Sequence, residues 1–390
     1  MKVVGYTSGA QPCGIADYHR KVAAGLAAVG VQCDTVPLPT GSVYRDRPVA
    51  LWKQRQLYAR LAARSGAYDA VLLDLLTHWN GLRAGENTLP AFINHLRGPL
   101  LMIVHEWPPM IDSESDSQSL PKRLLTQLAG VAIRLGERKG LPYEEWMAKR
   151  VFARAGHILV HARVLRDRLL AVGIPEERVT FQIFPIPRVQ ARVRSKVVDE
   201  FARRFAHRRK IVVFVFPHPR KTLEHAIQAL PQLPADVMLM FVGGIDGEFR
   251  RHYVRSLQEI ASRLGVLDRI EFLGEIPEPA LPFAFELGEF ALAPFSYATG
   301  SASFSYLIAE GMPIVATNLP EHETLVQDGA GIVMFKTGDI SALAHEVNGL
   351  LHDQEGRRRL AAQNRAFAEC HTYNNLAALI HDRLEDMIQS

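Results

Sequence analysis

The stretch from Pro294 to Leu319, PFSYATGSASFSYLIAEGMPIVATNL, decides which fold this sequence predicts. It begins at the end of an apolar strand, passes through a loop of small residues and a helix, and closes with a second apolar strand at 314–317. Gly311 ends the helix, and Pro313 precedes the second strand. The helix directs the positive end of its dipole at the loop, where small side chains let backbone N–H groups approach a ligand. We therefore expect a phosphate to bind at this loop.

The order of strand, loop and helix recurs along the whole chain. An apolar run at 3–6 leads through a glycine-containing loop into a helical repeat of apolar residues, which Gly30 closes. Further apolar runs predict strands at 33–38, 70–76, 100–105, 157–161, 179–184, 210–216, 236–242, 269–273, 290–294 and 332–335. Helical stretches separate most of these strands, and such alternation is typical of parallel sheets covered by helices.

The alternation breaks once, at the proline-containing segment FPIP at 184–187, and then starts again. The sequence therefore predicts an α/β protein with two Rossmann-like domains facing a central cleft. We expect the N-terminal domain at 1–187, the C-terminal domain at 188–374, and a last helix at 375–390 that returns to the N-terminal domain. Ligands of such folds bind at the carboxyl ends of the strands, so the site is expected there.

The composition fits two globular domains. The chain has 390 residues, of which 48% are hydrophobic and 22% are charged, values close to the globular average. A formal net charge of +4 is too small to indicate a nucleic-acid-binding protein. The three cysteines lack metal-site spacing, which favours a reducing compartment over a disulfide framework. Neither a signal peptide nor an apolar run of about 20 residues is evident, so we expect a cytoplasmic protein.

Several short motifs together resemble the retaining glycosyltransferases of family four, which have the two-Rossmann-domain GT-B architecture. The resemblance extends over nearly the whole chain and rests on the order and spacing of these motifs. They are PCGIADY at 12–18, VHEW at 104–107, FPIP at 184–187, the pair Arg220-Lys221, FLGEI at 272–276 and GMPIVAT at 311–317. The resemblance implies a nucleotide-sugar donor, with neither a cofactor nor a metal ion.

The resemblance also implies roles for individual residues. Arg220 and Lys221 would stabilise the departing diphosphate, and His105 would contact a sugar hydroxyl or help to orient the acceptor. The expected donor contacts are Gly14, Gly274, Glu275, Gly300, Ser301, Ser303 and Tyr306. The expected acceptor contacts are Asp17, Glu106 and Trp107.

One part of the family pattern is missing from this chain. Most members of the family carry two glutamates separated by seven residues around the phosphate loop, one near the donor sugar and one on the ribose. Counting back from Gly311 places Ala298 and Tyr306 at these two positions. The loop at 300–303 resembles instead a glycine- and serine-rich variant found in the wider family.

Each candidate residue also has a purely structural interpretation. His105 fits a histidine that backbone groups satisfy at a strand end, and Gly14 fits an ordinary turn between a strand and a helix. Lys221 lies near a helix start, where the helix dipole disfavours a cation, and this misplacement favours a functional role. Glu321 and Glu323 are candidates to replace the missing acids, but acidic residues are also common in a first helical turn.

Two charged segments invite functional interpretations of their own. The segment 120–168 is rich in arginine and lysine interleaved with leucines and Trp146, as in a surface that rests on anionic lipid. The alternative is a solvated helical face, which is the commoner reason for a run of charges. The acidic run DSESDS at 112–117 alternates with serines, which is typical of a polar loop rather than a metal site.

The sequence thus predicts a glycosyltransferase that moves a sugar from a nucleotide-activated donor to a hydroxyl acceptor, with retention of configuration as the resemblance implies. The acceptor is expected to be a glycan, a lipid-linked molecule or a small molecule. Peripheral membrane contact through 120–168 stays open as the alternative to a solvated helical face. Two alternatives stay open. One is a non-catalytic protein that binds a nucleotide or glycan on the same fold. The other is a nucleotide-sugar epimerase of that fold, which would act without any acceptor.

Overall fold

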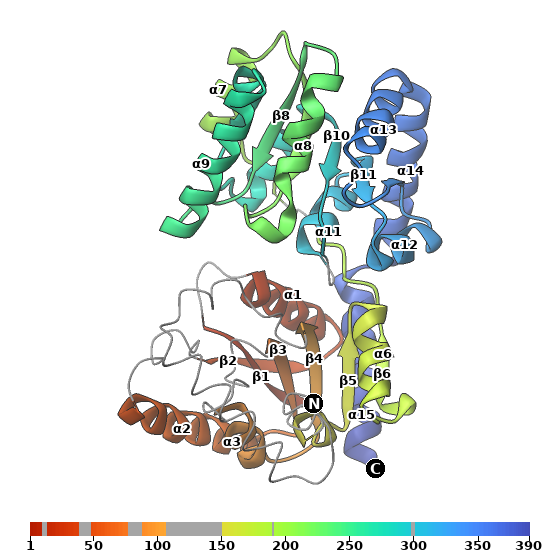
Figure 1. Ribbon diagram of the computed structural model, residues 1–390. Coiled ribbons are helices and arrows are strands. Elements are labelled where there is room, and N and C mark those ends of the chain that lie inside the picture. The colour runs from red at the N-terminus through yellow and green to blue at the C-terminus, as the bar shows by residue number, and fades with distance from the viewer. Residues whose placement is uncertain (10–13, 39–47, 77–87, 107–149, 189–190, 298–300) are drawn as a thin grey trace. The chain divides into compact units, whose positions relative to one another are not determined.

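Figure 1 shows the computed structural model of the chain, which describes residues 1–9, 14–38, 48–76, 88–106, 150–188, 191–297 and 301–390. The chain forms two compact units. One consists of Met1–Ile183 together with Tyr373–Ser390, and the other of Phe184–Thr372. No helix within the described ranges combines the length and the apolar character needed to span a bilayer.

The first unit is built on a six-stranded sheet in which all neighbouring strands are parallel. The strands, in spatial order, are β2 (Gln32–Leu38), β1 (Lys2–Ser8), β3 (Ala70–Leu76), β4 (Leu100–Glu106), β5 (His157–Val160) and β6 (Val179–Phe181). The helices are α1 (Gly14–Ala28), α2 (Pro48–Ala63), α3 (Thr88–His95), α6 (Arg163–Ala171) and α15 (Tyr373–Gln389). Apolar residues of β1, β3, β4 and β5 are fully buried, as expected where helices cover both faces of a parallel sheet.

The C-terminal helix α15 belongs to the first unit, although the whole of the second unit precedes it in the sequence. It packs against α1, and Gly25 allows the close approach of the two helices. A Cβ atom at this glycine would lie 2.9 Å from the Cβ of Ala377 and 3.0 Å from the carbonyl oxygen of Tyr373. The chain therefore leaves the first unit near residue 183 and returns to it at Tyr373.

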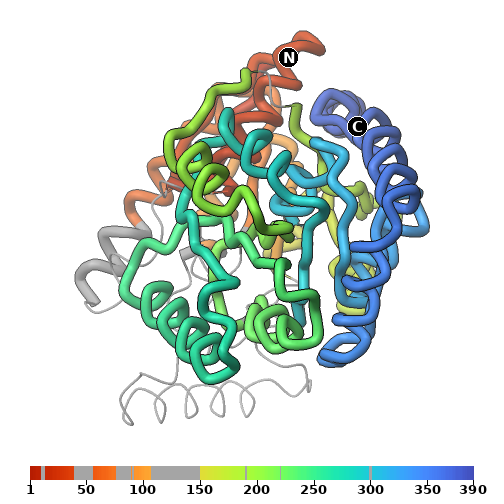
Figure 2. The backbone as a smooth tube through the Cα atoms, turned by 90° about the horizontal axis from the view of Figure 1, so that it is seen from above, coloured from red at the N-terminus to blue at the C-terminus, as the bar shows by residue number. Residues whose placement is uncertain are grey.

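The second unit repeats the architecture with another all-parallel, six-stranded sheet. The strands, in spatial order, are β12 (Ile332–Phe335), β11 (Ile314–Thr317), β10 (Gly288–Ala293), β7 (Arg209–Phe214), β8 (Val237–Val242) and β9 (Ile270–Phe272). The helices are α7 (Lys196–Arg204), α8 (Leu223–Ala229), α9 (Glu248–Arg263), α10 (Leu281–Phe285), α11 (Ala302–Ala309), α12 (Pro320–Gln327), α13 (Ile340–His352) and α14 (Gln354–Cys370). Helices α13 and α14 lie side by side in blue in both Figure 1 and Figure 2.

The expected fold class is confirmed, because each apolar run that predicts a strand forms one and the two sheets are parallel. The stretch 294–319 has the expected form, with α11 between β10 and β11. Gly311 follows α11 with φ of 65°, the left-handed conformation that ends a helix. The strand expected at 179–184 is shorter than expected and ends at Phe181.

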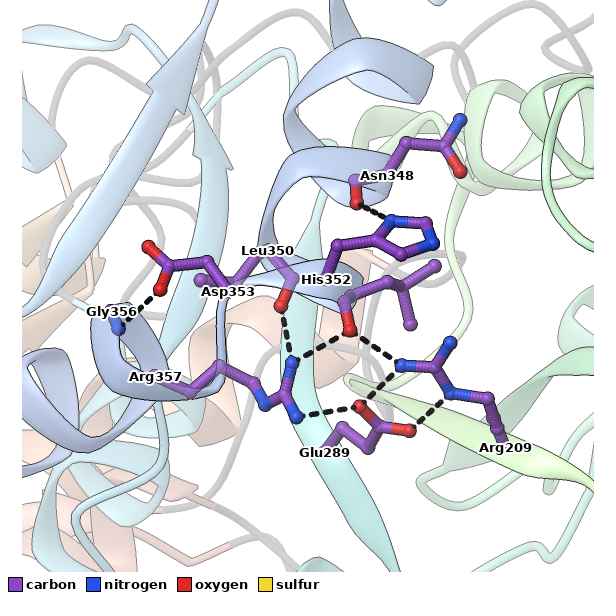
Figure 3. Close-up of polar contacts among 9 residues, drawn as sticks. Arg209, Glu289, Asn348, Leu350, His352, Asp353, Gly356 and Arg357 are labelled. Carbon is purple, nitrogen blue, oxygen red and sulfur yellow. Dashed lines mark hydrogen bonds and ion pairs between the residues drawn. The ribbon is translucent and has the colours of Figure 1, made fainter.

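An ion-pair network ties the amino ends of two strands of the second unit to the helices α13 and α14 (Figure 3). Glu289 at the start of β10 forms a bidentate pair with Arg209 of β7, with distances of 2.6 and 2.8 Å, and a contact of 3.3 Å with Arg357 of α14. Both arginines also donate to the carbonyl oxygen of Leu351, at 2.7 and 2.9 Å. Because the last carbonyl groups of a helix lack partners within the helix, the two arginines satisfy the end of α13.

Candidate functional site

Each sheet contains a point where the order of the strands reverses. In the first unit β1 has β2 on one side and β3 on the other, so the reversal lies between β1 and β3. In the second unit β7 leads to β8 and β9 in one direction, while β10 lies on its other side. Parallel α/β sheets bind ligands at the carboxyl ends of the strands at such a point. These two places are where the candidate residues should lie.

In the second unit, the loops that follow β7 and β10 are joined at the reversal point. The hydroxyl of Thr222 donates to the carbonyl oxygen of Pro294 at 2.5 Å, and the Nζ atom of Lys221 lies 4.4 Å from the ring centroid of Phe295. Thr222 has φ of 42°, a left-handed conformation that costs a threonine about 1 kcal/mol or more. The structure thus brings Lys221 to the beginning of the stretch 294–319.

A chain of hydrogen bonds supports this arrangement from β11 and α12. The hydroxyl of Thr317 donates to the carbonyl oxygen of Phe295 at 2.6 Å, and Nδ1 of His322 donates to the carbonyl oxygen of Thr317 at 2.7 Å. The imidazole of His322 stacks on the ring of Phe304, with centroids 4.5 Å apart. Burial, with a smaller contribution from Lys221, lowers the pKa of His322 to about 4. The neutral ring therefore carries a lone pair on Nε2, which has no hydrogen-bond partner among the described residues.

The helix α11 presents its amino end at the same edge of the sheet. Ser301 caps the helix, and its hydroxyl oxygen accepts a hydrogen bond of 3.4 Å from the backbone N–H of Phe304. Ser303 lies half-buried in the first turn, and the ring of Tyr306 meets Phe214 edge-on at 6.1 Å. Tyr306, which takes the place of an expected glutamate, is therefore directed at the end of β7. Gly300 lies outside the described residues.

The remaining donor candidates lie at the ends of β8 and β9. Gly274 has φ of 73°, and its carbonyl oxygen accepts a hydrogen bond of 2.9 Å from the backbone N–H of Gly243. Glu275 is exposed, and a Cβ atom on Gly244 would lie 3.5 Å from its carboxylate. Arg220 belongs to the short turn Pro219–Lys221. All three candidates, Gly274, Glu275 and Arg220, lie at the carboxyl edge of the sheet, where a nucleotide is expected.

The two acids proposed to replace the missing glutamates differ in their surroundings. Both lie in the first turn of α12. Glu321 is half-buried, and burial raises the pKa of its carboxyl group, whereas Glu323 is exposed. Glu310 has a partner of its own, since its carboxylate lies 2.7 Å from Arg192. Of the two acids in the first turn of α12, Glu321 is thus the partly desolvated one.

In the first unit, a buried carboxylate bridges two histidines at the reversal point between β1 and β3. Asp74 of β3 contacts Nδ1 of His19 at 2.5 Å through one oxygen and Nε2 of His105 at 3.0 Å through the other. Burial alone would raise the pKa of Asp74, but the two histidines hold it well below its usual range. Burial alone would lower the pKa of His19, but Asp74 outweighs it and raises the pKa to about 10. Asp74 and His19 thus form a buried ion pair.

Gly5 of β1 makes room for this cluster. A Cβ atom at Gly5 would lie 2.4 Å from both Cε1 and Nε2 of His19 and 3.1 Å from the sulfur of Cys33. Such contacts are far shorter than any that a side chain tolerates. Position 5 therefore requires a glycine, because the imidazole of His19 occupies the space that a side chain would need.

A second pair of side chains holds His105 from the other side. The ring of Tyr18 meets His105 edge-on at 4.8 Å, and its hydroxyl lies 2.7 Å from Nε2 of His161. Nδ1 of His161 donates to the carbonyl oxygen of Gln182 at 2.8 Å. Burial lowers the pKa of His161 to about 3, so Nε2 of its neutral ring accepts a hydrogen bond from the hydroxyl of Tyr18.

The other candidates of the first unit lie near this cluster in sequence but have different surroundings. Gly14 begins α1, and a Cβ atom there would meet nothing within 4 Å, so packing does not require a glycine. Asp17 pairs with Lys21 at 2.8 Å and also with Arg20. Burial raises the pKa of Asp17, but these two cations lower it overall. Glu106 is half-buried at the end of β4, and Trp107 lies outside the described residues.

The segment expected to contact a membrane is described only from residue 150 onward. Within that part several arginines have partners in the protein itself. Arg154 donates to the carbonyl oxygens of Leu96 and Gly98, and the guanidinium of Arg163 lies 4.7 Å from the ring centroid of Phe181. Membrane contact and the roles of the candidate site residues stay predictions. Among the described residues, no three or more His, Cys, Asp or Glu side chains gather as ligands for a metal ion.

Comparison with known proteins explains the architecture of the second unit. Residues 198–367 match the profile of the family described as "Glycosyl transferases group 1". This part of the chain is therefore similar to group 1 glycosyltransferases. The matched residues contain the joined loops after β7 and β10, with Lys221, Phe295 and α11. The expected resemblance to family-four-like glycosyltransferases is confirmed.

Two curated relatives show how far the similarity extends. A D-inositol 3-phosphate glycosyltransferase of Xylanimonas cellulosilytica is 31% identical over 160 residues, which are 40% of this chain and 37% of the relative. A GDP-mannose-dependent alpha-(1-6)-phosphatidylinositol monomannoside mannosyltransferase of Mycolicibacterium smegmatis is 27% identical over 339 residues. That alignment covers 80% of this chain and 81% of the relative. The matches to the first relatives span only about a third of their length.

The similarity in fold extends beyond residues 198–367 to the entire chain. The structure of Anabaena HepE in complex with UDP-glucose aligns with a TM-score of 0.68 at 16% identity. The alignment covers 99% of this chain and 100% of HepE. Both units therefore have the arrangement of strands and helices found in GT-B glycosyltransferases, and the expected GT-B fold is confirmed.

Sequence reasoning missed several residues that the structure places at these sites. They are Thr222, Phe295, Thr317 and His322 in the second unit, and His19 and Asp74 in the first unit. One signal was available for Asp74, because a single carboxylate interrupts the apolar strand 70–76. A buried carboxylate requires charged or hydrogen-bonding partners. The sequence does not indicate which residues these partners are.

Proposed function

We propose that this protein transfers a sugar from a nucleotide-activated donor to a hydroxyl acceptor, with retention of configuration. The main observation in support of this proposal is the position of Lys221. Its ammonium group lies beside Phe295 at the strand reversal, and the loop it belongs to is bonded to the loop that precedes α11. A cation and a helix amino end at one sheet edge are the groups that bind a diphosphate. This edge lies within the residues that match group 1 glycosyltransferases.

The chemistry follows from this arrangement. During transfer, the bond between the anomeric carbon and the diphosphate breaks, and negative charge develops on the oxygen of the leaving group. The ammonium group of Lys221 and the backbone N–H groups at the amino end of α11 would stabilise that charge. Phe295 supports the ammonium through its ring face and limits the positions that the flexible lysine stem takes. A group held in place before the reaction stabilises the charge without the cost of reorganisation.

The relatives support a nucleotide-sugar donor and an acceptor with hydroxyl groups. The mycolicibacterial relative is named as dependent on GDP-mannose, and HepE was solved with UDP-glucose. We propose a donor of this general class, with a glycan, a lipid-linked or a small-molecule acceptor.

A panel experiment tests this proposal. Purified protein is incubated with UDP-, GDP- and ADP-sugars, with and without a cell extract as the source of acceptor. Acceptor-dependent release of the nucleoside diphosphate is the expected result, and proton NMR of the product should show the anomeric configuration of the donor. Binding without turnover would indicate a non-catalytic protein, and conversion of the donor without acceptor would indicate an epimerase. A product of inverted configuration would contradict the retaining mechanism.

A further inference from the structure

We propose that Asp74 is a positioning residue for His105. It fixes the imidazole with its proton on Nε2 and so leaves Nδ1 as a hydrogen-bond acceptor for a substrate hydroxyl. The inference rests on the proposed function, because it assumes a sugar substrate at the carboxyl end of the first sheet. It goes beyond the resemblance in assigning a protonation state to His105 and a cause for that state.

The contact between the two residues determines which nitrogen carries the proton. Oδ1 of Asp74 lies 3.0 Å from Nε2 of His105, and an ionised carboxylate only accepts hydrogen bonds. Nε2 must therefore donate, and a neutral ring then carries its lone pair on Nδ1. The edge-on contact with Tyr18 at 4.8 Å holds the plane of the same ring. No hydrogen bond to Nδ1 occurs within the part of the chain that the structure describes.

The second histidine of the cluster supplies the counter-charge of Asp74. His19 is almost completely buried and already balances the charge of Asp74 at 2.5 Å. Asp74 therefore has one charged partner, His19, and accepts a further hydrogen bond from Nε2 of His105. Among the described residues, the other titratable groups that face the ring from neighbouring elements are Tyr18, with Tyr373 behind it, and His161. The pKa of Tyr18 is raised and that of His161 lowered, so both are neutral and neither offers a compensating charge.

The position of His105 suits contact with a substrate. The residue lies at the carboxyl end of β4, is 9% exposed and is the member of the cluster nearest to solvent, while His19 and Asp74 are 1% and 3% exposed. The buried pair therefore acts as a rigid support for a ring at the sheet edge. Loss of such a support typically reduces activity or affinity by about 10- to 100-fold, because the supported group loses its orientation.

The protonation state can be measured without any substrate. Long-range proton–nitrogen NMR correlations distinguish protonated from unprotonated ring nitrogens, and comparison with His105→Gln assigns the signals. We expect His105 to carry its proton on Nε2 near neutral pH. A proton on Nδ1, or on both nitrogens, would overturn the inference. Because this readout needs no sugar transfer, its failure is distinguishable from a failure of the proposed function.

A double-mutant cycle tests whether Asp74 acts through His105. Asp74→Asn should lower kcat/KM about 10- to 100-fold. The same substitution in the His105→Gln background should change little, since the supported ring is already absent. If Asp74→Asn lowers kcat/KM by the same factor in both backgrounds, Asp74 does not act through His105 and has only a structural role. Asp69→Asn is the matched control, because Asp69 is an exposed aspartate directly before β3.

Asp74→Asn leaves His19 charged and unpaired in the interior, so the variant has a risk of misfolding. Asp74→Asn combined with His19→Gln removes both charges and replaces the first variant if that one does not fold. Calorimetry of donor binding in the absence of acceptor then shows which substrate carries the hydroxyl that His105 contacts. Weaker donor binding by the variant assigns this hydroxyl to the donor sugar. Unchanged donor binding together with a raised KM for the acceptor assigns it to the acceptor. Unchanged kinetics in a folded double variant would overturn the inference.

Discussion

The buried pair of His19 and Asp74 predicts how the stability of the first unit depends on pH. The folded protein holds the pKa of His19 at about 10, against 6.5 for an ordinary histidine. Because the pKa is raised on folding, the contribution of His19 is complete below pH 6.5 and is lost as the pH rises toward 10. In this window the native state holds a proton that the unfolded chain has released. Replacing His19 by glutamine removes this dependence.

The size of the effect follows from the single proton involved. One proton changes the free energy of unfolding by about 1.4 kcal/mol per pH unit, so about 3 kcal/mol is lost between pH 7 and pH 9. Urea unfolding followed by tryptophan fluorescence reports on this unit alone, since all four tryptophans belong to Met1–Ile183. The difference in stability between the natural protein and His19→Gln should shrink by that amount over the interval.

A control variant and a contradicting result are both available. His95→Gln replaces an exposed histidine of α3 in the same unit and serves as the control for the loss of a histidine side chain. A stability difference for His19→Gln that stays constant from pH 7 to pH 9 would show that His19 is not charged beside Asp74. The cluster would then be held by neutral hydrogen bonds, and the proposed support of His105 would have no charged partner.

Three further predictions concern packing and charge elsewhere. Glu289→Gln should lower the unfolding free energy of the second unit by about 1–3 kcal/mol, measured by hydrogen exchange, while the donor KM stays unchanged because the network lies at the amino end of the sheet. Gly5→Ala should lower the free energy of unfolding of the first unit by about 1–3 kcal/mol, seen as a lower urea midpoint, because the added methyl group would collide with His19. Gly14→Ala should change this free energy by less than about 0.5 kcal/mol, because a Cβ atom there meets nothing. In the natural protein, the hydrogen-exchange protection of β11 should fall as the pH is lowered from 6.5 to 4, because the unfolded chain binds a proton at His322 that the folded state, with a pKa of about 4, does not. In His322→Gln this fall should be absent.

The fold was readable from the sequence because its signals are local. The run 100–105 is apolar throughout and forms β4, which is buried on both faces of a parallel sheet. Gly30 and Gly311 end their helices in the left-handed conformation, which glycine adopts at little cost. Each of these features depends on a few adjacent residues, and no distant part of the chain is needed to interpret them.

The sites were only partly readable, because they depend on contacts between distant residues. Lys221 was predicted as a site residue, but its partner Phe295 lies in a loop that only the β7–β10 pairing brings near. Asp74 meets His19 across 55 residues, and the apolar periodicity around each gives no sign of the other. Trp107 and Gly300, predicted from the resemblance, lie outside the described residues, so the structure does not test them.

The most direct test of the proposed function is the transfer rate of the Lys221→Ala variant. Its acceptor-dependent release of nucleoside diphosphate is compared with that of the natural protein and of Lys196→Ala, which removes an exposed lysine of α7 in the same unit. Loss of a cation that stabilises the leaving diphosphate should lower kcat by about 10²- to 10³-fold, with the fold intact, while Lys196→Ala keeps the natural rate. A folded Lys221→Ala variant with an undiminished rate would contradict the assignment of the diphosphate site.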